Sequence, residues 1–373
     1  MELKVGTKNL ATEIGYAISV VEHKSTIPIL SHLFLQASDG ALEIAATDLE
    51  VTFKSRIPCE VLKEGGITVP AKSFAQITRG FLDSDELTVR ITEERKLSVI
   101  PASKKSEYFL NTLPVEDFPR LITHQEKGFS VPLDIFKKMV KEVFVSIGPE
   151  DSRFSISGVL FMVEPKSLTM VSTDSHRLSY SSRNLEIPVE NQLRILVPKK
   201  ILAESLKFEG SGDLKILVKD NQIFLSSLER VLYSRLKDVK FPAWEKVIPK
   251  DVPVTATLNR EGFLEMLKRI SYVSDSKTRA VSFEFKKEGT VRIETRNEEG
   301  DTGNESYACD SYAGEDVKVT LNCDYLADYF SAVQDDVVTI KMKDSETQCL
   351  IESVRQDQGG GVCINVIMPL RTE

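Results

Sequence analysis

The segment TDSHR places Ser175, Asp174 and His176 side by side, which are the residue types of a hydrolase triad. A catalytic triad needs three side chains that converge from separate segments, whereas neighbouring residues of a strand point to opposite faces. The glycine run at 359–361 lacks the Lys-Ser or Lys-Thr that completes a phosphate-binding loop. The sequence therefore predicts no catalytic residue and no nucleotide-binding loop.

Cysteine and histidine are the residues most often used to hold zinc, and here they are dispersed. They are Cys59, Cys309, Cys323, Cys349, Cys363, His23, His32, His124 and His176. No cysteines have CxxC spacing, and no two histidines lie four apart with a glutamate between them. This pattern predicts reduced thiols, no disulfide framework, no metal site and no cofactor.

The length of 373 residues exceeds one ordinary hydrophobic core, so two or three domains are expected. No run of eighteen apolar residues occurs, and the N-terminal segment lacks a basic region followed by an apolar one. These features predict a cytoplasmic protein with no membrane partner. The net charge of −8 argues against general coating of nucleic acid, because such affinity comes from cations that displace counterions. Any DNA-binding surface must therefore concentrate its positive charge locally.

Stepping along the chain, one unit recurs three times, each time as a strand followed by an amphipathic helix. These segments are 3–21, 129–147 and 254–273. Their first helical apolar residues, Leu10, Phe136 and Phe263, lie 126 and 127 residues apart. The apolar positions that follow keep helical spacing. Such a period is typical of repeated structural units.

A second helix recurs in phase, within 67–91, 195–218 and 319–342. Its markers Pro70, Pro198 and Asn322 lie 128 and 124 residues apart. Two more markers keep the period between the first two units: AATDLEVTFKS (45–55) matches VSTDSHRLSYSS (171–182), and LPVEDFPRLI (113–122) matches LKDVKFPAWEKVI (236–248). Four ordered markers at one period indicate a repeated domain.

Between the helices lie alternating or β-branched runs joined by tight turns, of which Asp39-Gly40 is the clearest. Two helices and about eight strands in each unit indicate an α+β fold with helices packed on antiparallel sheet. The predicted domains are residues 1–125, 126–250 and 251–373.

Several motifs then carry a resemblance to a known family. They are STIPIL (25–30), TDLE (47–50), VPAKSF (69–74), LPVEDFPRL (113–121), TDSHRL (173–178), KFPAWEKVIPK (240–250) and INVIMPLR (364–371). Together with the repeat plan, they make the whole chain similar to the bacterial DNA sliding clamp, the beta subunit of DNA polymerase III. TDSHRL combined with MPLR is the specific part, whereas VPAKSF alone is weak.

The resemblance implies three domains of the DNA-clamp fold and a head-to-tail homodimer that forms a ring, with helices lining the hole. It implies a non-catalytic processivity factor that encircles double-stranded DNA without sequence preference. The implied protein partners are the alpha subunit of DNA polymerase III, the clamp loader, other polymerases and repair proteins.

Local charge agrees in sign with a DNA channel. The six predicted helical windows are 9–22, 72–81, 134–145, 199–208, 260–271 and 324–333. They hold eleven cations and nine anions, so they total +2 and the rest of the chain −10. The difference is small, and solvated helix faces on any acidic protein would also explain it. A weak lining nevertheless suits a tether, because each tight phosphate contact would slow sliding.

The resemblance also implies particular DNA-binding residues, which would contact phosphate without reading bases. They are Lys24, Lys72, Arg153, Lys199 and Lys200. Lys24 and Lys72 stand where the family commonly has arginine, so they keep the charge and lose the bidentate fork. The stretch GPEDSRFSIS (148–157) is acidic and has Ser155 where the family often has an aromatic residue, which weakens the prediction for that loop.

A hydrophobic pocket for short linear motifs of partner proteins is implied near the C-terminus. Its residues would be Ile156, Thr173, His176, Arg177, Leu178, Pro242, Val247, Gln348, Val366, Ile367, Met368, Pro369, Leu370 and Arg371. A flexible methionine lets such a pocket accept different anchors. The alternative is that 368–370 only completes an edge strand of the third domain.

The resemblance further implies that the first domain contacts the third domain of a second subunit. The predicted interface residues are Lys104, Lys105, Tyr108, Leu110, Tyr272, Val273, Glu298 and Glu299. Opposite charges across such an interface set orientation more than affinity. Glu107 lies where a cation is expected, so the apolar part of the interface is the firmer prediction.

A different class of protein also fits the repeats taken alone: an enzyme or scaffold built of repeated α+β domains, with no role on DNA. Retention on circular DNA separates the two classes, because only a ring is released when the circle is cut.

Overall fold

The computed structural model describes residues 1–22, 26–103, 105–124, 126, 128–149, 156–189, 192–354 and 360–371. The chain packs as two compact units, each considered by itself below. The first comprises residues 1–133 and 200–236, and the second comprises 134–199 and 237–373. Lys24, Lys104 and Arg153, three of the predicted site residues, lie outside the described residues.

Six α-helices occur in the described part of the chain: α1 (Thr7–Ile18), α2 (Ala71–Gly80), α3 (Leu133–Phe144), α4 (Lys199–Ser205), α5 (Arg260–Ser271) and α6 (Cys323–Ala332). Three short 3-10 helices accompany them: η1 (Pro28–Ser31), η2 (Val115–Asp117) and η3 (Trp244–Lys246). Each predicted helical window overlaps one of the α-helices, with starts that differ by at most two residues, so the six predicted helices are confirmed.

The first unit holds two antiparallel sheets. Its five-stranded sheet has the order β5 (Glu60–Lys63), β1 (Glu2–Gly6), β7 (Glu86–Ile91), β8 (Leu97–Pro101) and β9 (Tyr108–Leu110). Its eight-stranded sheet has the order β10 (Phe129–Pro132), β15 (Asp213–Lys219), β16 (Gln222–Ser227), β17 (Arg230–Arg235), β4 (Val51–Pro58), β3 (Ala41–Thr47), β2 (His32–Ser38) and β6 (Gly65–Pro70).

The second unit also holds two antiparallel sheets. The nine-stranded sheet has the order β14 (Leu193–Pro198), β11 (Gly158–Glu164), β12 (Ser167–Thr173), β13 (Arg177–Asn184), β26 (Val362–Ile367), β25 (Cys349–Val354), β24 (Val337–Met342), β18 (Val254–Asn259) and β22 (Ser311–Ala313). The four-stranded sheet has the order β21 (Thr302–Ala308), β20 (Thr290–Arg296), β19 (Ala280–Lys286) and β23 (Val317–Asn322).

The order of elements along the chain repeats three times. Each repeat starts with a strand that leads directly into a helix, continues through strands to a second strand–helix pair, and ends with three strands. This is the α+β plan that the sequence predicts. The boundaries at 125/126 and 250/251 stay predictions, because the two compact units divide the chain at other positions.

Strand pairing joins the predicted domains edge to edge. In the first unit, β17 of the second domain pairs with β4 of the first, with Arg230 opposite Ser55. In the second unit, β13 of the second domain pairs with β26 of the third, with Arg177 opposite Ile367. The middle domain therefore contributes strands to both compact units.

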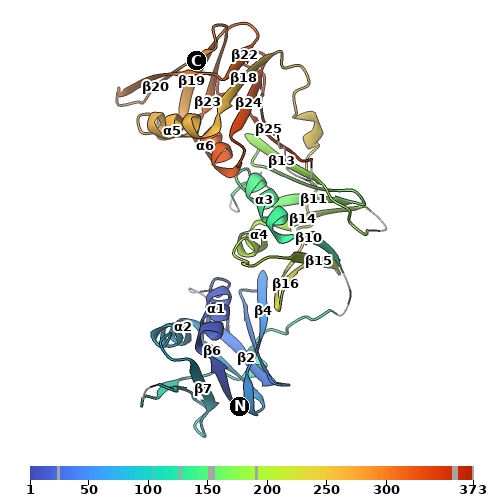
Figure 1. The fold of residues 1–373 in the computed structure, drawn as a ribbon, viewed down its shortest axis with the longest axis vertical. Helices are drawn as coiled ribbons and strands as arrows, with labels where there is room; N and C mark the ends of the chain where they lie inside the picture. Colours follow the sequence, from blue (N-terminus) through green and yellow to red (C-terminus); the bar gives the residue numbers. More distant parts are fainter. Residues whose placement is uncertain are drawn as a thin grey trace. The chain divides into compact units, whose positions relative to one another are not determined.

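Each helix begins directly after a strand, and its apolar face packs inward. Asn322 caps α6 by accepting hydrogen bonds from the backbone N–H groups of Asp324 and Tyr325. Helices α1 and α2 pack against each other, and α5 and α6 do the same (Figure 1). In α2, the buried residues include Phe74 and Thr78, one helical turn apart.

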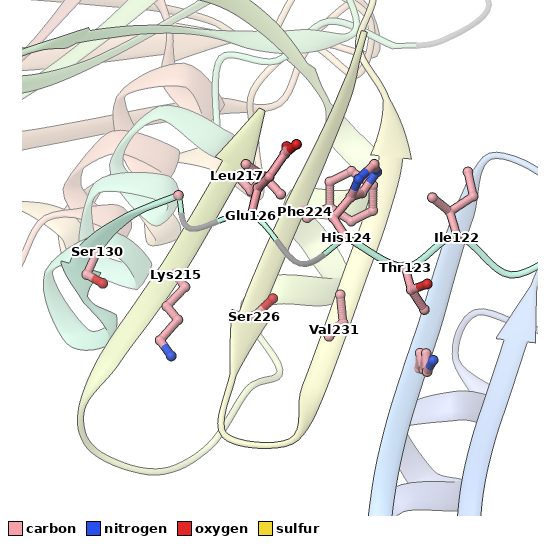
Figure 2. A pocket seen from close by; sticks show the side chains of 12 residues that line it. Ile122, Thr123, His124, Glu126, Ser130, Lys215, Leu217, Phe224, Ser226 and Val231 are labelled. Carbon is pink, nitrogen blue, oxygen red and sulfur yellow. The ribbon is translucent and has the colours of Figure 1, made fainter. Parts of the chain in front are cut away.

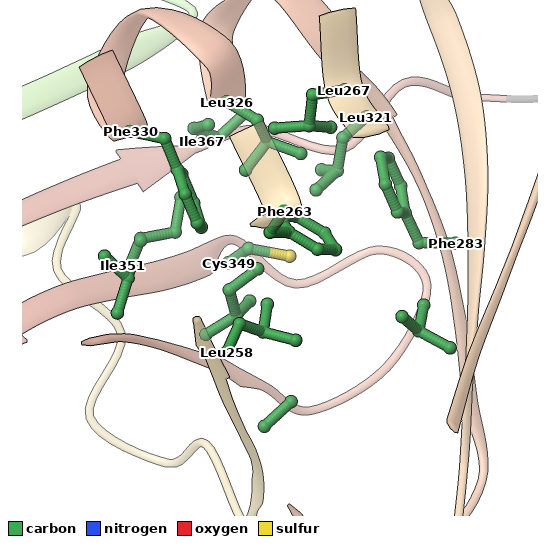
Figure 3. Packing of buried hydrophobic residues seen from close by; sticks show 14 of the residues in the cluster. Leu258, Phe263, Leu267, Phe283, Leu321, Leu326, Phe330, Cys349, Ile351 and Ile367 are labelled. Atoms are coloured by element: carbon green, nitrogen blue, oxygen red, sulfur yellow. The ribbon is translucent and has the colours of Figure 1, made fainter. Parts of the chain in front are cut away.

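One extensive core belongs to the third domain and lies between helices α5 and α6 and the sheets (Figure 3). Phe263 is fully buried there, with its ring centroid 5.2 Å from that of Phe330 and 6.4 Å from that of Phe283. Such aromatic contacts add stability beyond the area that they bury. The core gives the C-terminal strand β26 a rigid support.

Two turns of the predicted repeat have the same hydrogen bonds. In the first domain, Asp48 Oδ1 accepts from the N–H groups of Glu50 (2.9 Å) and Val51 (2.8 Å), and Leu49 has φ 76°. In the second domain, Asp174 Oδ1 accepts from the N–H groups of His176 (3.0 Å) and Arg177 (2.9 Å) in the same way, and Ser175 has φ 78°. The TDLE and TDSH segments are thus equivalent in structure as well as in sequence.

Candidate functional site

The turn that connects β12 to β13 holds several of the residues that the sequence predicts for the partner pocket. Thr173 Oγ1 donates to the carbonyl oxygen of Arg177 at 2.8 Å and accepts from the N–H of Ser175 at 3.2 Å. Asp174 Oδ1 accepts from the N–H groups of His176 (3.0 Å) and Arg177 (2.9 Å). Four local hydrogen bonds therefore hold the turn, and Ser175 and His176 are exposed at its tip. The carboxylate of Asp174 serves as a backbone cap, as in other Asx turns, and not as part of a triad.

Arg177 links this turn to helix α6. Its Nε lies 3.0 Å from Asp174 Oδ2 and its Nη1 lies 2.7 Å from Asp328 Oδ2. The guanidinium also lies 4.2 Å from the centre of the Tyr325 ring. Only 10% of the Arg177 side chain is exposed, so these contacts fix its geometry. Burial is the main cause that raises the pKa of Tyr325 above its usual value.

Strand β26 lies beside this turn and brings in the C-terminal residues. Val366 pairs with Leu178, and Ile367 pairs with Arg177. The N–H of Met368 then donates to the carbonyl oxygen of His176 at 3.0 Å. Residues far apart in sequence are thereby held together by a backbone ladder.

Successive side chains of β26 point to opposite faces of the sheet and belong to two different apolar clusters. Val366 is fully buried in an apolar cluster with Leu178 and Trp244. Ile367 is also fully buried, but it belongs to the core of the third domain. Met368, the next residue, is 40% exposed. The structure thus places Ile367 in the support of the strand and Met368 at its surface.

The apolar cluster behind the turn is larger than the sequence predicts. Its buried members are Leu160, Val171, Leu178, Leu196, Phe241, Trp244, Leu350, Ile364 and Val366. Ile156 packs against it, as does Tyr180, whose ring centroid is 5.4 Å from that of Trp244. Val247 is 36% exposed and follows the 3-10 helix η3. Apolar side chains from β13, β26 and the segment around η3 therefore lie next to each other in this cluster.

The remaining predicted pocket residues differ in exposure and in their backbone hydrogen bonds. Pro242 is exposed, and its carbonyl oxygen accepts from the N–H of Trp244 at 2.8 Å. Gln348 is half-buried beside Cys349, which pairs with Ile367. Leu370 donates its N–H to the carbonyl oxygen of Thr320 at 2.8 Å. Pro369 is half-buried and Arg371 is exposed.

The sequence does not predict four of the residues that build this site. Tyr325 and Asp328 approach Arg177 from a helix about 150 positions along the chain, and no local pattern signals that contact. Phe241 and Trp244 lie within the KFPAWEKVIPK motif, and their large apolar side chains are the signal that could have placed them in the cluster.

The cations predicted to contact DNA differ in their surroundings. Lys72 is exposed near the start of α2. The Lys199 ammonium lies 5.4 Å from the centre of the Phe144 ring. Lys200 forms ion pairs with Asp48 and Glu50, which both belong to the TDLE turn. The charge of Lys200 is therefore partly neutralised within the protein.

Several helix anions are neutralised by arginines from outside the helices. These ion pairs are Glu13–Arg230, Glu142–Arg183, Asp324–Arg279 and Asp328–Arg177. The pKa of Arg230 is raised above its usual value, mainly by its hydrogen bond with Glu13. Helix cations such as Lys72, Arg79 and Lys141 are exposed. The solvent-facing sides of these helices are therefore more positive than their composition indicates.

The residues predicted for subunit contact lie on two exposed surfaces. Tyr108 is 42% exposed on edge strand β9, next to a cavity of about 610 Å³ lined by Gln76, Ile77, Gly80, Phe81, Ser106 and Tyr108. Tyr272 is 84% exposed at the end of α5, and Val273 is half-buried. Leu110 is half-buried as well.

The charged residues of the predicted interface are also exposed. Glu298 forms an ion pair with Lys277 at 3.1 Å, and Glu299 and Lys105 are exposed. Glu107 accepts hydrogen bonds from Ser98 (2.6 Å) and Arg90 (3.0 Å), which lower the pKa of its carboxyl group. Arg90 thus neutralises Glu107, the acidic residue that lies where the sequence comparison leads us to expect a cation.

The described residues include neither a candidate metal site nor a candidate membrane span. No group of three or more histidine, cysteine, aspartate or glutamate residues among them could hold a metal ion. No described helix is long and apolar enough to cross a membrane.

Comparison with known proteins matches the chain along its whole length. The models of the N-terminal, central and C-terminal domains of the DNA polymerase III beta subunit match residues 1–122, 130–243 and 245–371. The beta sliding clamp of Haemophilus influenzae is 30% identical over 379 aligned positions, which cover 100% of both chains. This chain belongs to the beta sliding clamp family. The beta sliding clamp of Escherichia coli K12 is 29% identical, again over 100% of both chains.

Solved clamp structures have the same fold. A crystal structure of the DNA polymerase III subunit beta from Pseudomonas aeruginosa superposes with a TM-score of 0.91 at 26% identity, covering 100% of both chains. A sliding clamp from Bacillus subtilis gives a TM-score of 0.92 at 22% identity over the same coverage. The chain therefore has three repeated domains of the clamp fold, each with two helices packed on antiparallel sheet.

Proposed function

We propose that this protein is the processivity clamp of a bacterial replicative DNA polymerase: a non-catalytic, cytoplasmic homodimer that encircles double-stranded DNA and binds polymerases, the clamp loader and repair proteins. The observation that carries the proposal is the full-length match to beta sliding clamps, domain by domain. An enzyme or scaffold with no role on DNA is not favoured, because such a protein would not share all three domains with this family.

Two free strand edges support closure into a ring. Within the chain, two domain junctions are formed by edge pairing, β17 with β4 and β13 with β26. Strands β9 and β21 end their sheets and pair on one side only among the described residues. Edge strands readily accept another strand, so β9 of one subunit and β21 of the next would form a third junction of the same kind.

An exposed aromatic residue and a cavity supply the apolar part of this contact. Tyr272 and Val273 lie at the end of α5, and β21 runs beside them, since a Cβ added at Gly303 would lie 2.6 Å from Val273 Cγ2. The cavity next to Tyr108 lies beside the other edge strand. Tyr272 of one subunit would enter the cavity of the next, with Lys105 facing Glu299.

Tyr272→Ala tests the ring. Loss of a central aromatic anchor typically costs an interface about 2 kcal/mol or more, so the dimer dissociation constant should rise roughly 30-fold. Sedimentation of the full chain measures it. The control is Val337→Ala, another exposed apolar residue (43%) of the same domain, which should leave the dimer unchanged.

The ring also predicts a topological result on DNA. Wild-type protein loaded onto a nicked circle should be released when the circle is linearised, and Tyr272→Ala should be retained on the circle less than the wild type at the same protein concentration, because fewer of its rings are closed. Retention of the wild type on linear DNA with free ends would contradict enclosure.

The helix charges support a weak, sequence-independent contact with phosphate. Buried arginines neutralise several helix anions, while Lys72, Arg79 and Lys141 stay exposed. We keep Lys24, Lys72, Arg153, Lys199 and Lys200 as the proposed DNA contacts. Lys200 should contribute least, because Asp48 and Glu50 already engage its ammonium group.

The turn at Thr173–Arg177 and the end of β26 support the partner-binding site. A rigid backbone holds exposed Met368 beside His176, and the apolar cluster with Trp244 lies behind Leu178 and Val366. Partner motifs would place aliphatic or aromatic anchors on this patch, with Arg371 and His176 at its rim.

Met368→Ala tests this site. The loss of a flexible apolar contact should weaken binding of a clamp-binding peptide from a bacterial replicative polymerase about tenfold. Fluorescence anisotropy with a labelled peptide measures it. Val362→Ala is the matched control, because Val362 is on the same strand and is 53% exposed. Equal loss in both variants would contradict the assignment.

A further inference from the structure

A cavity in the first compact unit belongs neither to the subunit contact nor to the partner-binding site. It has a volume of about 500 Å³, within the range of small-molecule sites. Its walls come from the linker residues 122–124, 126 and 128 and from strands β4, β10, β15, β16 and β17 of the eight-stranded sheet (Figure 2).

Strand register places a polar row along the floor of the cavity. Lys215 on β15 pairs with Ser130 on β10 and with Ser226 on β16, so the three side chains share one face of the sheet. Directly opposed residues have Cβ atoms about 5 Å apart. Figure 2 shows the two serines on either side of Lys215. A cation flanked by two hydroxyl donors is suited to a phosphate or carboxylate group.

Lys215 is available for such a group. It is exposed, and the described part of the chain offers it no ion pair or hydrogen bond. The other charged residues of the cavity have partners: Lys54 pairs with Glu43 at 2.9 Å, and Glu126 pairs with Lys219. Lys215 is therefore the cation of this cavity best placed to receive an anion.

An apolar and aromatic row lies next to the polar one. Leu217 pairs with Phe224, and Phe224 pairs with Tyr233. His124 from the linker covers Phe224, with ring centroids 4.5 Å apart and planes at 79° (Figure 2). The Nε2 atom of His124 is covered and has no hydrogen-bond partner among the described residues. A covered polar atom without a partner is costly, which marks His124 as an unsatisfied polar group in the wall of the cavity.

Two described linker residues, Ile122 and Gly128, contact the sheet directly. Gly128 approaches β15 so closely that a Cβ there would overlap the carbonyl oxygen of Ile216. The hydroxyl of Tyr233 accepts from the N–H of Ile122 at 3.1 Å. These contacts hold Ile122 and Gly128 against the sheet on which the cavity lies.

We propose that this cavity binds a small organic anion. Its phosphate or carboxylate group would lie on Lys215 between Ser130 and Ser226, and its flat apolar part would lie against Leu217 and His124, which line the same cavity. The site is independent of DNA enclosure and of partner binding, since its residues belong to neither.

Phenyl phosphate is the probe that tests the proposal, with the full-length dimer and NMR of the histidine side chains as readout. The expected result is a saturable shift of the His124 resonance, assigned with His124→Gln. Inorganic phosphate and benzyl alcohol should each bind at least about tenfold more weakly, because each offers only half of the complementary chemistry.

Variants locate the anionic group. Lys215→Ala and Ser226→Ala should weaken phenyl phosphate binding about tenfold and about threefold, as expected for a charged and a neutral hydrogen bond. Lys8→Ala, an exposed lysine of the same unit, should have no effect. All of these positions are at least partly exposed, so the variants should fold.

Three outcomes would overturn the proposal. One is the absence of a saturable His124 shift with phenyl phosphate. Another is equal affinity for inorganic phosphate and phenyl phosphate. The third is unchanged affinity in Lys215→Ala.

Discussion

Arginines carry the long-range polar contacts of this molecule at the residue scale. Arg183 binds Glu142, Arg230 binds Glu13, and Arg177 binds Asp174 and Asp328. In each case a strand supplies the arginine and a helix supplies at least one carboxylate. The planar guanidinium forms several hydrogen bonds at once, which lysine cannot reproduce.

Glu142→Gln tests the most buried of these pairs. The Glu142 side chain is fully buried, and Arg183 Nη2 lies 3.0 and 2.9 Å from its two oxygens. The substitution leaves the arginine charge buried without a counter-ion, so the free energy of unfolding should fall by about 3 kcal/mol. Urea denaturation measures it.

An exposed pair provides the control for that measurement. Lys287 and Glu315 lie 2.8 Å apart with side chains 68% and 84% exposed. Glu315→Gln should change stability little, since solvent screens the attraction between exposed charges. A similar loss in both variants would show that burial is not the cause.

The surroundings of the proposed partner site could be predicted only in part. TDSHRL and MPLR predicted Thr173, Arg177 and Met368 because these residues lie within short segments with a distinctive order. The contact of Arg177 with α6 could not be predicted, since it depends on how two distant segments pack.

At the element scale, turns and helices follow from local sequence. Asp39 and Gly40 have φ values of 49° and 67°, the left-handed conformation that an Asp-Gly hairpin requires. Each predicted helix forms where helical spacing of apolar residues follows a strand. Both patterns depend on neighbours only a few residues away.

The sheet to which a strand belongs cannot be predicted from local sequence in the same way. The sequence predicts strands, but edge pairing between β17 and β4 leaves no local signal, because both strands would also fit a sheet confined to one domain. Alternation gives the buried face of a strand and not the identity of its neighbour. This is why the two compact units could not be predicted.

The repeated turn gives a prediction at this scale. Asp48→Ala removes an acceptor for two backbone N–H groups and also the main partner of Lys200. We expect a loss of about 1–2 kcal/mol in the free energy of unfolding, as for other lost caps. Asp48→Asn keeps the acceptor and should lose less. Equal losses would show that the ion pair, and not the backbone cap, dominates.

At the scale of the whole molecule, the middle domain is shared between two bodies. Its strands β10, β15, β16 and β17 lie in the first unit, and β11, β12, β13 and β14 lie in the second. The three sequence repeats therefore do not coincide with the two units in which the chain packs.

A fragment of residues 126–250 should therefore be unstable by itself. It would expose the edges of β13 and β17, which pair with other domains in the full chain. Exposed edges favour aggregation, so the fragment should elute as oligomers or precipitate. Size-exclusion chromatography checks this. A monomeric fragment with a cooperative thermal transition would contradict the prediction.

The β4–β17 ladder also has a consequence during synthesis. Ser55 pairs with Arg230, so a strand of the first domain must await a partner that is translated 175 residues later. At bacterial elongation rates of about 5–20 residues per second, the delay is roughly 10–35 s. For that time the nascent chain presents the unpaired edge of β4 beside the ribosome, which makes this stage of translation the period in which the protein most needs protection from its neighbours.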